Sequence, residues 1–360
     1  MTAKIHLVAG ARPNFMKIAP LYHALAKTDW AEPIIVHTGQ HHDRLMSDVF
    51  MDDLRLPKPQ ANLGAGSGTH AETTAAVMIA YERFCQKARP DYVVVVGDVN
   101  STAAAALVAK KLLLPVAHLE AGLRSFDRTM PEEINRLVTD AISDLLWTPS
   151  EDADENLVRE GVPARRIDRI GNIMIDSYEM LRSRIKEADT PSTFGLKHGA
   201  YGVVTLHRPS NVDDPKKLAM IFQQLSAVAL NVPLVFPVHP RTRKKLDDAP
   251  PSAHIRMIEP MGYVQFMSLV ENAALAITDS GGLQEETSYL GIPCLTVREN
   301  TERPITITCG TNRLVGATEL SAAAADALTP KPRDPRAAIP LWDGHTAERA
   351  VESLHAHLIR

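Results

Sequence analysis

Residues 277–303, ITDSGGLQEETSYLGIPCLTVRENTER, contain a short strand, a glycine turn, a helix and a second strand in close succession. The apolar run 273–278 predicts the first strand, and residues 283–290 have helical spacing. Gly291 is suited to end the helix, because glycine adopts the left-handed conformation without a steric penalty. Residues 293–297 predict another buried strand. Repeated strand–helix units of this kind build a parallel sheet covered by helices.

The turn of this unit, residues 279–282 (DSGG), is suited to bind an anion. Ser280 and the two glycines at a helix start leave backbone N–H groups and the positive end of the helix dipole open. Glu285 or Glu286, one turn into the helix, can accept hydrogen bonds from ribose hydroxyls. The alternative is a capped turn whose acidic residues only complement the helix dipole.

Strands alternate with helices in both halves of the chain, which predicts two doubly wound α/β domains with ligand groups at the carboxyl ends of both sheets. Residues 186–201 are the most linker-like segment, being polar with Pro191 and Gly195. The expected strands are 5–9, 34–38, 91–96, 115–119 and 167–170 in the first half, and 202–206, 234–238, 255–258, 275–278 and 293–297 in the second.

The composition excludes several classes of protein. A chain of 360 residues is too long for one typical core, so two domains are expected. A net charge of -4 gives no basic surface for nucleic acid. The chain has no run of about 18 apolar residues and no signal-like start, so we expect a cytoplasmic protein without a membrane partner. Three separated cysteines and the absence of metal-ligand spacing predict neither a disulfide framework nor a metal site.

Charged residues follow the predicted strands of the first half. Asp98 and Glu120 end two strands separated by one helix; if these strands are neighbours, they stand about 4.8 Å apart and bring both carboxylates to one edge of the sheet. Arg12 follows the first strand, Lys17 lies in the next helix, and Glu132 begins a later helix. Three carboxylates beside two cations suit proton transfer next to an anionic ligand. The alternatives are that Asp98 is a helix cap and that Glu132 is an ordinary acidic residue of a first helical turn.

In the second half, His207 and Arg208 directly follow the predicted strand 202–206. They are therefore expected at the ligand-binding end of that sheet, although a single histidine at a strand end is often structural. No nucleophile elbow, P-loop or kinase motif occurs.

Eight segments carry a more specific pattern: GARPNFMKIAP (10–20), TGQHHD (38–43), VVGDVNST (95–102), HLEAGLRS (118–125), MPEEINR (130–136), LHRPSN (206–211), TDSGGLQEE (278–286) and ENTERP (299–304). In this order and spacing the chain resembles the non-hydrolysing UDP-N-acetylglucosamine 2-epimerases over nearly its full length. The resemblance implies an α/β fold of glycosyltransferase-B architecture, in which two Rossmann-like domains, 1–172 and 173–345, face each other across a cleft. It also implies that a C-terminal helix, 346–360, packs back on the N-terminal domain, and that the protein is a homodimer.

The activity implied is that of an isomerase that interconverts UDP-GlcNAc and UDP-ManNAc, or a close UDP-2-acetamido sugar, for surface polysaccharide synthesis. Members of the family eliminate UDP to give a 2-acetamidoglycal and add it back to the opposite C2 configuration, so no cofactor and no metal are implied. Carried over by position, the catalytic residues are Asp98, Glu120, Glu132, Lys17 and His207. The residues expected to bind UDP are Arg12, Arg208, Phe266, Ser280, Gly281, Gly282, Glu286 and Arg303.

Other activities remain open at this point. A glycosyltransferase that uses a UDP-sugar is the main alternative, because fold alone does not fix function. A hydrolysing epimerase and a non-catalytic binder of sugar nucleotides are further alternatives. The loop 123–131 is shorter than in the commonest bacterial members, and we expect the choice of sugar to be made there.

Many bacterial members are activated by a second UDP-sugar, bound partly by two glutamines and an arginine. Gln40 can supply the first glutamine, but the second position falls near Ser47, and neither Arg nor Lys occurs between Lys58 and Arg83. We therefore expect this activation to be weak or absent.

Overall fold

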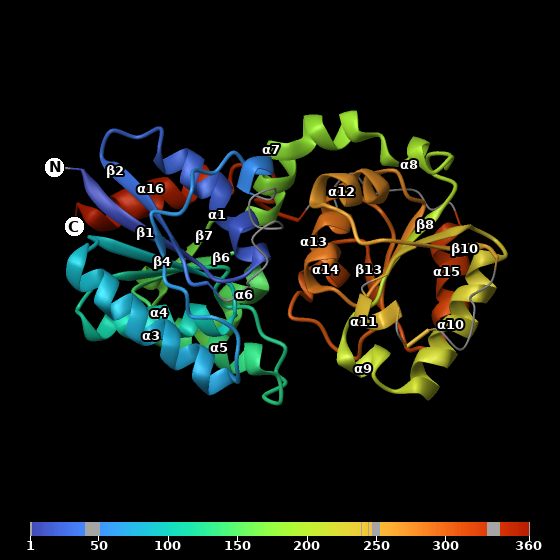
Figure 1. Ribbon diagram of the computed structural model, residues 1–360, viewed down its shortest axis with the longest axis horizontal. Helices are drawn as coiled ribbons and strands as arrows, with labels where there is room; N and C mark the ends of the chain where they lie inside the picture. The colour runs from blue at the N-terminus through green and yellow to red at the C-terminus, as the bar shows by residue number, and fades with distance from the viewer. Residues whose placement is uncertain are drawn as a thin grey trace. The chain divides into compact units, whose positions relative to one another are not determined.

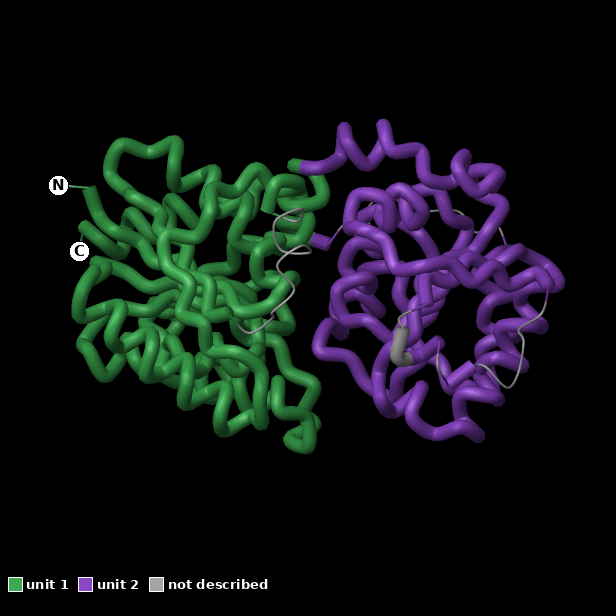
Figure 2. Tube along the Cα trace, viewed as in Figure 1, with its two compact units in different colours: residues 1–180, 340–360 green, residues 181–339 purple. Residues whose placement is uncertain are grey.

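The computed structural model describes residues 2–39, 51–238, 240–243, 245–246, 253–329 and 339–359. The chain forms two compact units, Met1–Met180 with Pro340–Arg360, and Leu181–Ile339 (Figure 2). Gln40 and Ser47, on which the expectation about activation depends, lie outside the described residues.

The first unit is a parallel sheet of seven strands in the order β3-β2-β1-β4-β5-β6-β7 (Figure 1). All five residues of the central strand β4 are buried, which is typical of a parallel strand covered on both faces. The strands are β1 (Ala3–Ala9), β2 (Ala31–His37), β3 (Ala61–Asn62), β4 (Tyr92–Val96), β5 (Val116–Leu119), β6 (Leu145–Thr148) and β7 (Ile167–Arg169). The helices are α1 (Arg12–Leu25), α3 (His70–Lys87), α4 (Asn100–Lys111), α5 (Pro131–Ile142), α6 (Glu151–Arg159), the first part of α7 (Ile173–Ala188) and α16 (Thr346–Leu358).

The second unit is a parallel sheet of six strands in the order β10-β9-β8-β11-β12-β13. Its strands are β8 (Gly202–Thr205), β9 (Leu234–Pro237), β10 (Ile255–Ile258), β11 (Leu275–Thr278), β12 (Cys294–Thr296) and β13 (Asn312–Leu314). Its helices are α8 (Thr190–Thr193), α9 (Pro209–Val212), α10 (Pro215–Ala229), α11 (Pro240–Arg243), α12 (Tyr263–Glu271), α13 (Gly281–Leu290), α14 (Ile305–Thr308) and α15 (Leu320–Leu328). Two Rossmann-like units in one chain are the components of the glycosyltransferase-B architecture.

The helix α16 lies against α1 in the first unit, although the two are at opposite ends of the chain (Figure 1). Asp176 accepts a hydrogen bond from Ala347 N–H at 2.7 Å and so satisfies a backbone donor at the start of α16. Trp147 Nε1 donates to Ser353 Oγ at 2.9 Å. Among the described residues, no helix is both long enough and apolar enough to cross a membrane.

Most strands occur where the sequence predicts them, but three were missed. The missed strands, β3, β6 and β13, have two to four residues, and such short runs carry no clear periodicity. The segment 186–201, the most linker-like in the sequence, is partly helical: α7 continues to Ala188, α8 spans Thr190–Thr193, and residues 194–201 lie outside helices and strands.

Candidate active site

Two turns that carry carboxylates follow neighbouring strands of the first unit. β4 pairs with β5 in parallel, with Val96 opposite Leu119, and Gly97 N–H donates to the Leu119 carbonyl at 3.1 Å. The strands β4 and β5 are therefore neighbours, which is the condition for Asp98 and Glu120 to lie at the same edge of the sheet. Asp98 and Glu120 follow these strands and lie at one edge of the sheet.

Lys17 and Glu120 form an ion pair in which each residue is only 9% exposed. Gly97 lies beside this pair: a Cβ at that position would be in van der Waals contact with it, 3.4 Å from Lys17 Nζ and 3.7 Å from Glu120 Oε2. The φ of Gly97, +66°, favours glycine. The helix α1 thus places one cation directly against one of the two carboxylates.

The backbone of Glu120 has a φ of 77°, which is uncommon for a residue with a side chain. The N–H groups of Glu120 and Ala121 both donate to the carbonyl of Trp147 on β6, at 3.1 and 3.0 Å. Left-handed backbone at a non-glycine residue costs roughly 1–3 kcal/mol and persists where the surroundings enforce it, as at active sites. The strain at Glu120 therefore supports a functional role for its side chain.

Asp98 is paired with Arg136, a cation that is not among the predicted site residues. Arg136 on α5 contacts Asp98 on one side and Glu133 on the other, with Arg136 Nη2 2.6 Å from Glu133 Oε2. Glu133 also accepts hydrogen bonds from the N–H groups of Ser125 and Phe126, at 3.0 and 2.9 Å. Burial raises the pKa of Glu133, but the bonds from Ser125 and Arg136 outweigh burial and hold it below its usual value.

The two adjacent acids of α5 therefore lie in different environments. Glu133 is 2% exposed and fully engaged, whereas Glu132 is exposed in the first turn of the helix. The catalytic assignment of Glu132 stays a prediction. Glu133 and Arg136 share one face because they are three residues apart on a helix, and this spacing in MPEEINR was the signal that could have identified them.

In the second unit, Asp279 joins the two loops that carry the predicted phosphate-binding residues. Asp279 directly follows β11 and is fully buried. Its carboxylate accepts hydrogen bonds from the backbone N–H groups of His207 and Arg208, at 3.1 and 3.0 Å. The carboxylate of Asp279 also lies 3.0 Å from His207 Nδ1. Because Nδ1 is occupied by this contact, a ligand would bind His207 through the other ring nitrogen, Nε2, of the half-exposed imidazole. Burial raises the pKa of Asp279, but the bonds with His207 outweigh burial and hold it below its usual value.

The turn 279–282 brings Arg303 to the start of α13. A Cβ on Gly281 would lie 2.8 Å from Arg303 Nη1, so only glycine allows this close approach. Glu285 holds Arg303 through an ion pair of 2.7 Å. Ser280 is the N-cap residue, and its side chain makes no capping hydrogen bond. A Cβ on Gly282 would meet nothing within 4 Å, so the backbone is open at this position.

Glu286 lies one turn into α13 and is 5% exposed. Tyr263 on α12 donates to its Oε1 at 2.6 Å. Burial raises the pKa of Glu286 to about 7, with a further contribution from the charge of Glu285. Phe266, one turn after Tyr263 on the same helix, is half-buried.

The remaining predicted residues occupy the expected ends of their strands. Arg208 follows β8 and lies 3.7 Å from Glu302, the acid next to Arg303. Arg12 is the first residue of α1, after β1, and is half-buried. Within the residues that the structure describes, no group of three or more His, Cys, Asp or Glu side chains is placed to hold a metal ion.

Comparisons with known proteins show the family to which the chain belongs. A sequence model of the family described as UDP-N-acetylglucosamine 2-epimerase matches residues 23–355. The UDP-N-acetylglucosamine 2-epimerase of Methanocaldococcus jannaschii is 42% identical, over 98% of each chain. The UDP-2,3-diacetamido-2,3-dideoxy-D-glucuronate 2-epimerase of Pseudomonas aeruginosa is also 42% identical, over 87% of this chain and 88% of its own. The crystal structure of the M. jannaschii enzyme with UDP-GlcNAc and UDP superposes with a TM-score of 0.89 at 41% identity, covering 98% of this chain and 99% of that chain.

Proposed function

The chain belongs to the UDP-N-acetylglucosamine 2-epimerase family and is an isomerase, and from this we propose that it inverts C2 of a UDP-2-acetamido sugar in the cytoplasm. The route proposed is elimination of UDP to a 2-acetamidoglycal, followed by addition of UDP to the glycal with the opposite configuration at C2. The first step breaks the C1–O and C2–H bonds and the second forms both again, so the sugar returns at its original oxidation level.

The second unit is proposed to hold UDP throughout this cycle. The first N–H groups of α13, Arg303 and the outer edge of His207 would bind the diphosphate, and Glu286 would accept hydrogen bonds from the ribose hydroxyls. UDP carries an additional negative charge once the C1–O bond has broken. Donors already fixed in position stabilise that charge without reorganisation, so UDP stays bound for the return step.

The first unit is proposed to transfer the protons. Inversion at C2 removes a proton from one face of the sugar and delivers a proton to the other, which requires two acid–base groups. Asp98 and Glu120 are two carboxylates on neighbouring strand ends, each paired with its own cation, Arg136 and Lys17. This pairing is the single observation that carries the proposal, because binding alone does not need two oriented carboxylates. Glu132 is proposed as a third acid–base group.

Proton NMR in deuterated water tests this function. With UDP-GlcNAc, we expect the C2 proton signal to disappear, the signals of the manno epimer to appear, and no free sugar to form. Formation of free N-acetylmannosamine would instead indicate a hydrolysing enzyme, and transfer of the sugar to an acceptor without C2 inversion would indicate a glycosyltransferase.

The identity of the sugar is a separate proposal. We propose UDP-GlcNAc and UDP-ManNAc as the pair, feeding surface polysaccharide synthesis, with a C3-, C4- or C6-modified UDP-sugar as the alternative. The relatives support both, since one is named for UDP-N-acetylglucosamine and another for a diacetamido glucuronate. Comparison of kcat/KM for the two classes of substrate decides between them.

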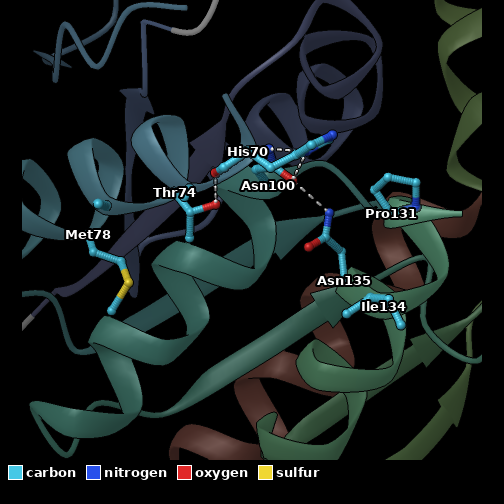
Figure 3. A pocket seen from close by; sticks show the side chains of 9 residues that line it. His70, Thr74, Met78, Asn100, Pro131, Ile134 and Asn135 are labelled. Carbon is cyan, nitrogen blue, oxygen red and sulfur yellow. Dashed lines mark hydrogen bonds between the residues drawn. The ribbon is translucent and has the colours of Figure 1, made fainter. Parts of the chain in front are cut away.

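We also propose that the protein is a homodimer. An open groove lies between α3 and α5 (Figure 3), and its lining includes Met78, Pro131 and Ile134. Ile134 is 44% exposed, so this groove presents a large apolar side chain to solvent. Light scattering should give twice the chain mass of 39.4 kDa, and Ile134→Glu should shift the protein towards the monomer.

A further inference from the structure

A fully buried histidine connects the two turns that carry Asp98 and Glu120. His118 lies on β5 and has no exposed surface. Its Nε2 is 2.8 Å from the carbonyl oxygen of Gly97, the residue before Asp98. Its Nδ1 is 2.6 Å from Oδ1 of Asp140 on α5.

Both partners of this imidazole act as acceptors. A backbone carbonyl can only accept, so Nε2 must carry a proton. The other oxygen of Asp140 accepts Gly122 N–H at 3.1 Å and lies 2.7 Å from Arg124 Nη1, as expected of an ionised carboxylate. Burial raises the pKa of Asp140, but His118 and Arg124 hold it below its usual value. Nδ1 must therefore also donate a proton.

Arg124 extends this set of contacts towards the surface. It makes a second, two-point contact at 2.8 and 2.7 Å with Glu160, whose side chain is 35% exposed. Lys17 and Glu120 form a separate ion pair beside Gly97.

We propose that His118 donates a hydrogen bond from each ring nitrogen and so positions the Asp98 and Glu120 turns relative to each other. One chain of contacts runs from the Gly97 carbonyl through His118 and Asp140 to Gly122 N–H, and thus from the residue before Asp98 to the second residue after Glu120. Two groups that act on the same carbon must keep their separation closely, because a misplacement of about 1 Å can cost roughly a hundredfold in rate. His118 is thus a positioning residue, and this role rests on the proposed function of the two carboxylates.

His6 provides a matched control within the same sheet. It is also fully buried, but its Nδ1 contacts the hydroxyl of Tyr81 at 3.2 Å and its Nε2 has no hydrogen-bond partner. Burial lowers the pKa of His6 to about 4, so it is neutral at pH 7. The same fold therefore holds one buried histidine of each charge state.

Nitrogen-15 NMR of the full chain labelled at histidine tests the charge directly. The signals among the 14 histidines are assigned from the spectra of His118→Gln and His6→Gln. At pH 8 without substrate, we expect protons on both nitrogens of His118 and on only one nitrogen of His6. A bare nitrogen on His118 would overturn the proposal, whether or not the protein is an epimerase.

Kinetics test the positioning role. We expect His118→Gln to lower kcat for C2 exchange about a hundredfold while the KM for the UDP-sugar changes less than about threefold, because UDP is assigned to the second unit. His6→Gln should leave kcat close to wild type. Wild-type kcat in His118→Gln, or an equal loss in both variants, would overturn the role. If His118→Gln fails to fold, the NMR result on the wild-type protein still decides the charge.

Discussion

Replacing Glu133 by glutamine tests whether this residue, unlike its neighbour Glu132, stabilises the folded protein. Glu133 Oε2 accepts Ser125 N–H and both Nε and Nη2 of Arg136, and Oε1 accepts Phe126 N–H. Glutamine keeps the size of the side chain but has one acceptor oxygen and no charge. In either orientation of the amide, at least one N–H loses its acceptor and Arg136 loses one of its two anions.

The size of the effect follows from burial. Side-chain exposure is 3% for Arg136 and 2% for Glu133, and removing one partner of a buried ion pair costs about 3–5 kcal/mol. Because Arg136 retains Asp98 as a partner, we expect the lower end, a loss of about 3 kcal/mol in the free energy of unfolding. Glu132→Gln should leave this free energy unchanged, since its side chain is exposed.

Tryptophan fluorescence during urea denaturation measures this difference in the free energy of unfolding, and it reports on the first unit of the chain, which contains Glu133. Trp30, Trp147 and Trp342 are all in the first unit, so the signal does not report unfolding of the second. Since the pKa of Glu133 is lowered by folding, its stabilisation is present above its unfolded value of about 4.3 and is lost as the pH falls below that. The wild type and Glu133→Gln should therefore converge in acid. Equal stability of the two at pH 7, or an equal loss in Glu132→Gln, would refute the assignment.

Four further outcomes are expected. Asp98→Asn and Glu120→Gln should each abolish C2 proton exchange, while calorimetry should give UDP affinities within about threefold of the wild type. Gly281→Ala should weaken UDP binding about tenfold or more, because the new Cβ displaces Arg303 from the start of α13, and unchanged affinity would contradict that geometry. The affinity for UDP-GlcNAc should rise between about pH 6 and 8 as Glu286, with its pKa of about 7, loses its proton and accepts the ribose hydroxyls; this dependence should be lost in Glu286→Gln. Trace UDP-GlcNAc should not accelerate the conversion of UDP-ManNAc, and a clear increase in rate would show that an activating site exists.

The main features of the fold were predictable because each depends on local sequence. The run YVVVV at 92–96 predicts a strand buried on both faces, and β4 is such a strand. Gly291 was expected to end α13, and it does so with a φ of 69°. Strand β6, LLWT, was missed because four apolar residues fit a helix or a strand equally well.

The sequence was sufficient to predict which turns carry the site residues. The order of the strands places Asp98 beside Glu120, and the turn 279–282 precedes a helix as expected. The partners of these residues were not predictable, because Arg136 and Asp98 are brought together by tertiary packing, in which α5 lies against α4. The same holds for Asp279, which looks like an ordinary strand-end acid in sequence but fixes two loops in the structure.

The proposed route requires that the bond between C1 and UDP breaks during inversion, and positional isotope exchange detects this cleavage. UDP-GlcNAc is prepared with oxygen-18 in the bridge between C1 and the β-phosphorus and is incubated with the wild-type protein. Elimination predicts that the label spreads to the non-bridging oxygens of the β-phosphate, as seen by phosphorus NMR, while C2 inverts. Inversion at C2 with the label still confined to the bridge would rule out elimination, because the C1–O bond would then have stayed intact.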